Sequence, residues 1–152
     1  MDLTKIVQDI QYVLAPAVMI SSSALLLLGF QNKFSSLVSR FRALNQEKRL
    51  LSQKKEKTPI DQERFLSVTE QVDRLAKRAT HVKNAILLAY SAIICFIATS
   101  ILLFFKIYTS LQLSHLAIAS FLLGLAFIFA ASILMIVEVT LAFNIVRIEK
   151  ES

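Results

Sequence analysis

Residues 34–51 read FSSLVSRFRALNQEKRLL, and residues 65–82 read FLSVTEQVDRLAKRATHV. In both segments mostly apolar residues recur at alternating steps of three and four, which is the spacing of a coiled-coil seam. The two series mirror each other, because residue 34 pairs with residue 82, residue 51 pairs with residue 65, and every step between them matches. The pattern predicts two helices folded back on one another as an antiparallel coiled-coil hairpin. Its seam residues are Phe34, Leu37, Phe41, Leu44, Leu51, Phe65, Val68, Val72, Leu75 and Val82.

The point of reversal has the residues that start a helix. Thr58 is suited to the N-cap, Pro59 to the first helical position, and Asp61 stands three residues after the cap. The second arm of the hairpin is therefore predicted to begin at Pro59.

Composition places the hairpin in a membrane protein. Of 152 residues 55% are hydrophobic, with only two Gly and two Pro, which is typical of long apolar helices. Residues 10–32, 84–105 and 107–137 carry no charged side chain, and about 20 apolar residues suffice to cross a bilayer. We predict an all-α integral membrane protein with three spans.

The expected organisation follows the chain in six parts. They are an amphipathic N-terminal segment with membrane helix 1 (1–32), the hairpin (33–83), membrane helix 2 (84–106), a short outer loop (107–115), membrane helix 3 (116–146) and a tail (147–152). The first fourteen residues fit either a helix in the outer interface that ends at a kink at Pro16, or a polar first turn of membrane helix 1.

The cations predict the orientation. Residues 31–83 hold 13 of the 17 Lys and Arg against six acids, and loops of this length obey the positive-inside rule. We expect the hairpin and the C-terminus in the cytoplasm and the N-terminus outside.

Small residues recur at heptad spacing in two of the spans. They are Ala85, Ala92 and Thr99 in membrane helix 2, and Ala117, Gly124 and Ala131 in membrane helix 3. Small residues let membrane helices approach closely. The two series predict a helix-packing face, used either within one chain or between copies.

Glu138 continues the heptad series of membrane helix 3 and is its one acid. An acid within an apolar span marks a functional candidate. It fits either an ion pair at the root of the hairpin, with Arg40 as the first choice and Arg42 or Lys33 as alternatives, or a role in ion or proton passage.

Ser21, Ser22 and Ser23 lie in the middle of membrane helix 1. Such hydroxyl groups either bond the carbonyl four residues earlier or join helices. They could instead line a pore, which three helices cannot enclose, so that reading requires an oligomer.

Catalysis and metal binding find no support in the sequence. The two histidines, His81 and His115, are expected on opposite sides of the membrane, and Cys95 stands alone. We expect no enzyme activity and no cofactor. The basic hairpin mixes charges of both signs, which favours anionic lipid headgroups at its root over nucleic acid.

Several segments resemble a known family. They are Leu14-Ala15-Pro16, Asn32-Lys33-Phe34, Ser39 to Leu44, Leu75 to Ala79, Asn84-Ala85-Ile86 and Glu138-Val139. Together they are similar to the small bacterial membrane proteins grouped as domain of unknown function 2721. The resemblance implies three spans in a bacterial inner membrane and no assigned activity. Ser39 departs from it where an acid often precedes the Arg, and so does Lys33 where Arg is usual.

Two functions fit these features. The first is a homo-oligomeric channel or transporter-like pore with the polar and small faces inward. The alternative is a non-conducting scaffold or adaptor whose basic cytoplasmic hairpin binds a partner.

Overall fold

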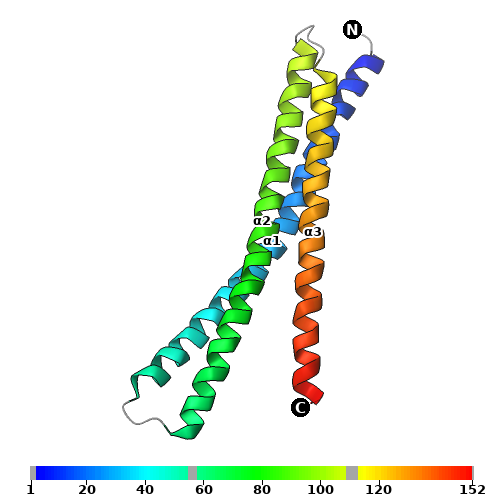
Figure 1. Ribbon diagram of the computed structural model, residues 1–152. Coiled ribbons are helices and arrows are strands. Elements are labelled where there is room, and N and C mark those ends of the chain that lie inside the picture. The colour runs from blue at the N-terminus through cyan, green and yellow to red at the C-terminus, as the bar shows by residue number, and fades with distance from the viewer. Residues whose placement is uncertain (1–2, 55–57, 109–112, 152) are drawn as a thin grey trace.

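The computed structural model describes residues 3–54, 58–108 and 113–151, with side chains at 7, 10–54, 58–106 and 113–142. These residues form three helices: α1 over Leu3–Gln53, α2 over Pro59–Tyr108 and α3 over Ser114–Glu151 (Figure 1). Nothing in the described ranges is a strand. The all-α prediction is confirmed, and all three helices are long and apolar enough to cross a membrane.

Each helix is longer than a span requires. α1 and α2 contain 51 and 50 residues, or about 75 Å at the helical rise per residue, against a hydrocarbon core of about 30 Å. No Gly or Pro interrupts the chain between Phe30 and Thr58, or between Pro59 and Gly124. No helix breaker lies at the boundary between the apolar and the charged part of either helix. α1 and α2 therefore each cross this boundary as one continuous helix.

The helices extend beyond the segments that were predicted to span the membrane. α1 runs from Leu3 through Pro16 as one helix, so the N-terminal segment is continuous with the apolar part of α1. α2 extends to Tyr108 and α3 starts at Ser114, which shortens the connection predicted over 107–115. The predicted tail is helical to Glu151, because its polar residues include neither Gly nor Pro. Residues 55–57 and 109–112, and the side chains of the tail, lie outside the described residues.

α2 lies between the other two helices. It contacts both of them, whereas α1 and α3 have few contacts with each other, and the C-terminal part of α3 stands apart from α2 (Figure 1). The start of α1, the end of α2 and the start of α3 lie at one end of the molecule, and the end of α1 and the start of α2 lie at the other. At the first end the ammonium of Lys106 lies 5.3 Å from the ring centre of Tyr12, a cation–π contact that joins α1 to α2.

The second half of α1 packs against the first half of α2 through the predicted seam. Leu37, Leu75 and Val82 form one buried cluster, with Phe34 and Phe41 packed against it. All the other seam residues are buried or half-buried. The two segments therefore meet through the residues that the 3–4 spacing selected. The interlocking of side chains that defines a coiled coil stays a prediction.

All three helices meet in a second cluster. Leu27 and Phe30 of α1 pack with Ala85 and Ala89 of α2 and with Ala131 of α3. The alanines let the larger side chains of α1 enter between the helices, so this cluster holds the apolar part of the three helices together.

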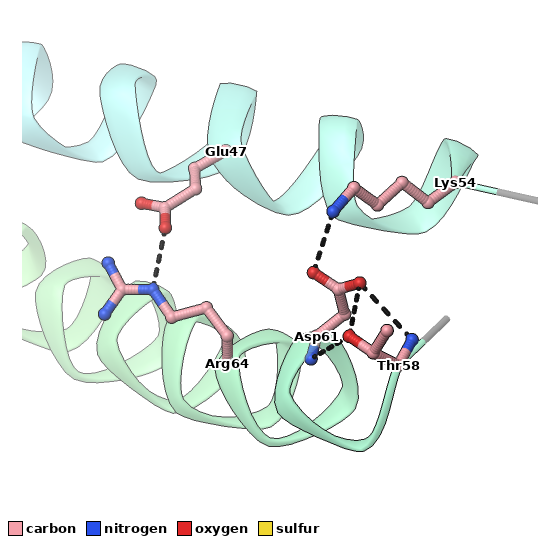
Figure 2. A network of polar contacts seen from close by, with 5 residues as sticks. All are labelled: Glu47, Lys54, Thr58, Asp61 and Arg64. Carbon is pink, nitrogen blue, oxygen red and sulfur yellow. Dashed lines mark hydrogen bonds and ion pairs between the residues drawn. The ribbon is translucent and has the colours of Figure 1, made fainter. Parts of the chain in front are cut away.

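The start of α2 is capped as predicted (Figure 2). The Thr58 hydroxyl accepts a 3.3 Å bond from the Asp61 amide, and the Asp61 carboxylate accepts bonds from the Thr58 amide at 3.3 Å and the Thr58 hydroxyl at 2.8 Å. This reciprocal arrangement is a capping box. Lys54 of α1 reaches the other Asp61 oxygen at 2.9 Å, and Arg64 donates to Glu47 at 2.8 Å, so two ion pairs join the helices near the connection.

The capping box makes the stability of the first turn of α2 depend on pH. The hydrogen bond from Lys54, followed by those from Thr58, lowers the pKa of Asp61 below its usual value. A lowered carboxyl pKa contributes stability above the ordinary aspartate range and loses it as the pH falls through the folded pKa. Amide exchange in the first turn of α2, corrected for its intrinsic pH dependence, should therefore accelerate in acid.

Asp61→Asn should remove this acceleration, while Asp73→Asn on the exposed face of the same helix should leave it unchanged. Thr58→Ala should loosen the first turn at every pH by about 1 kcal/mol. Identical acid profiles for Asp61→Asn and the parent chain would contradict this role.

Candidate functional site

The two heptad series of small residues face each other between α2 and α3. Ala85 packs in one cluster with Ala131, and the Ser120 hydroxyl donates a 2.9 Å bond to the carbonyl of Cys95. These contacts set an antiparallel register that also brings Ala92 opposite Gly124 and Thr99 opposite Ala117. All six small residues are buried. The predicted packing face is therefore used within one chain.

Gly124 lies close to a side chain of α2. A methyl group added there would lie 2.7 Å from Cε1 of Phe96. The Phe96 ring is fully buried, and it packs against Phe121 with ring centres 5.6 Å apart. Gly124 thus makes room on α3 for an aromatic side chain of α2.

Glu138 and Arg78 extend this α2–α3 register by one heptad. Nε and Nη2 of Arg78 donate to the same Glu138 oxygen, Oε1, at 3.0 and 2.8 Å. The Glu138 side chain is 0% exposed and that of Arg78 17%. Oε2 of Glu138 is buried without a hydrogen-bond partner among the described residues. The acid is therefore a buried charge held by one cation through one of its two oxygens.

The predicted partners of Glu138 were wrong. Arg40 and Arg42 are exposed on α1 and Lys33 is half-buried there, and none of the three forms an ion pair among the described residues. The reason is the layering, because α3 packs on α2 and has few contacts with α1.

The sequence held a signal for Arg78. The α2 series Ala85, Ala92 and Thr99, continued one heptad toward its N-terminus, arrives at residue 78. The α3 series continued one heptad toward its C-terminus arrives at Glu138. Two antiparallel series that are each extended by one step must end opposite one another.

Most of the hydroxyl groups in the apolar segments are engaged within the chain. Ser21 and Ser22 donate to the carbonyls of Ala17 and Val18 at 3.3 and 3.0 Å. Similar bonds to carbonyls four residues earlier are made by Ser91, Thr99, Ser100, Ser132 and Thr140. Ser23 differs, because its hydroxyl is buried without a partner in the described part of the chain.

The described residues contain no group of three or more His, Cys, Asp and Glu side chains that could hold a metal ion. Cys95 is half-buried and unpaired. The candidate site is the Arg78–Glu138 pair, a buried ion pair that joins α2 to α3.

The family model described as "Protein of unknown function (DUF2721)" matches residues 13–148. The chain belongs to this family. Comparison with curated proteins and with solved structures gave no match. In this DUF2721 protein the matched residues include both members of the Arg78–Glu138 pair and both heptad series, so the α2–α3 contact lies wholly within the family region.

Proposed function

We propose that this DUF2721 protein is a non-conducting adaptor in a bacterial inner membrane. Its three apolar helices serve as an anchor, and the charged halves of α1 and α2 form a cytoplasmic coiled-coil stalk that binds a partner. The N-terminus lies outside, since the positive-inside rule places the cation-rich stalk in the cytoplasm.

The observation that carries the proposal is that polar groups in the apolar segments already form hydrogen bonds within the chain. A water-filled pore needs polar groups free to face it. Here the hydroxyl groups of Ser21 and Ser22, although exposed, already bond their own helix, and the small-residue faces are closed against each other. The outward side chains of these segments are mainly Leu, Ile, Val and Phe, which suits contact with lipid.

The stalk has the properties of a binding arm. Its paired segments extend from residue 33 to residue 83 with no Gly, and at the helical rise each arm reaches roughly 30 Å from the membrane. Side-chain ion pairs join its arms near the tip, which holds the exposed surface in one arrangement.

Reconstitution tests the adaptor against the pore. Liposomes that contain the purified chain should stay as tight to ions as empty ones, and native mass spectrometry in nanodiscs gives the copy number. A defined ring together with an ion leak that changes on Glu138→Gln would establish the homo-oligomeric pore instead.

The adaptor also predicts a stalk-dependent contact. A photo-crosslinker at the exposed Gln46 should give a discrete adduct in cells. Phe41→Asp should abolish the adduct because it places a charge in the half-buried seam, whereas Asn45→Asp, which adds the same charge on the exposed face, should preserve it. No adduct with the parent chain, or one insensitive to Phe41→Asp, would contradict an intact stalk as the binding element.

A further inference from the structure

The charges of the stalk are unevenly distributed. Residues 43–73, which form its distal part, hold six Lys and Arg and six acids. Residues 33–42 and 74–83, which we call the root, hold seven Lys and Arg and no acid. The net positive charge of the hairpin is thus confined to the root.

The two root segments lie at one level of the molecule. Phe34, Leu37 and Phe41 of α1 pack with Leu75 and Val82 of α2 in one cluster, so residues 33–42 run beside 74–83. This level begins where the uncharged stretches of both helices end. At about 1.5 Å per residue, Lys77 lies roughly 9 Å beyond Lys83 along α2, which is close to the screening length at physiological salt.

Two of the seven cations form an ion pair among the residues that the structure describes. Arg74 pairs with Glu70, and Arg78 pairs with Glu138 of α3. The other five form no ion pair among the described residues: Lys33, Arg40, Arg42, Lys77 and Lys83. All of these except Lys33 are exposed. The root therefore presents a net positive charge that the chain itself leaves unbalanced.

At the same level most of the exposed side chains of α3 are apolar. The Arg78–Glu138 pair fixes α3 beside the root, and Met135 packs against the root cluster. Around them Ile133, Ile136 and Val137 are 45%, 66% and 41% exposed, and Val139 is 54% exposed. A ligand that covers both surfaces must combine an anionic group with an apolar body.

We propose that the root and the adjoining part of α3 bind anionic phospholipids. The headgroup phosphates lie against the five unpaired cations, and the acyl chains lie against the exposed apolar side chains of α3. The proposal rests on the membrane insertion proposed above. Each Lys or Arg near an anionic bilayer surface strengthens binding by roughly fivefold, so five together select anionic over zwitterionic lipid.

Native mass spectrometry of the full chain tests the site. In detergent that contains equal amounts of phosphatidylglycerol and phosphatidylcholine, phosphatidylglycerol adducts should dominate. The root variant Arg40→Gln/Arg42→Gln/Lys77→Gln should lower this preference on the order of a hundredfold. A distal variant, Arg49→Gln/Lys55→Gln/Lys57→Gln, removes the same charge and should retain it.

The outcomes separate this site from the proposed function. Equal loss in both variants would show that lipid follows net charge, and no loss in the root variant would exclude the root; either result overturns the proposal. If alkaline carbonate extracts the chain from membranes, the membrane anchor itself is wrong. If the chain stays in the membrane and phosphatidylglycerol is not preferred, only the lipid site is wrong.

Discussion

Arg78→Met is expected to destabilise the chain by about 3–5 kcal/mol. The substitution leaves the fully buried carboxylate of Glu138 without the cation that donates both of its hydrogen bonds. Its second oxygen already lacks a partner among the described residues, so the charge would have no compensation. The loss should appear as a lower midpoint of thermal or denaturant unfolding in detergent micelles.

Two further variants test whether the loss of the cation beside Glu138 causes the destabilisation. Glu138→Gln should cost less than Arg78→Met, because the guanidinium is 17% exposed and its long side chain can turn toward water. The double variant Arg78→Met/Glu138→Met should lie close to the parent chain, since apolar replacement of both partners of a buried pair is often neutral.

The matched control is the exposed pair of the same helix. Arg74 and Glu70 lie 2.6 Å apart with side chains 59% and 65% exposed, and such surface pairs contribute about 0–1 kcal/mol. Arg74→Met should therefore be nearly silent. If Arg78→Met lowers the stability as little as Arg74→Met does, Glu138 is not a buried charge and the ion pair between α2 and α3 does not form.

The helices could be predicted because their signals are local. Runs without charge set the apolar parts, the 3–4 spacing selected the face that α1 and α2 share, and Thr58 with Asp61 marked the start of α2. The ends of the helices were predicted less well. Apolar character was used to place them, whereas a helix continues through polar residues until Gly, Pro or a turn stops it.

The site needed information that no single segment carries. Glu138 could be singled out as an acid in an apolar helix, but its partner depends on which helix lies beside α3. Arg40 and Arg42 lie eight and ten residues beyond the first uncharged stretch, and Arg78 lies six residues before the second, so counting residues could not choose among them. The contacts of Ala85 with Ala131 and of Ser120 with Cys95 fix the register that brings Arg78 to the acid.

Gly124→Ala is expected to destabilise the chain by about 1–2 kcal/mol. Overpacking a core costs about 1–3 kcal/mol, and the better helix propensity of Ala returns up to about 1 kcal/mol. The packing cost should prevail, because the added methyl would lie 2.7 Å from Cε1 and 3.0 Å from Cδ1 of Phe96. That ring is fully buried, and its centre lies 5.6 Å from that of Phe121.

Gly29→Ala is the control for this prediction, because a methyl group there meets nothing within 4 Å. It should leave the unfolding midpoint unchanged or raise it slightly through helix propensity. Gly124→Ala/Phe96→Leu should recover part of the loss, since the smaller side chain leaves room for the methyl. If both glycine variants shift the midpoint equally, α2 and α3 do not approach at Gly124, and the register that joins Arg78 to Glu138 would lose its support.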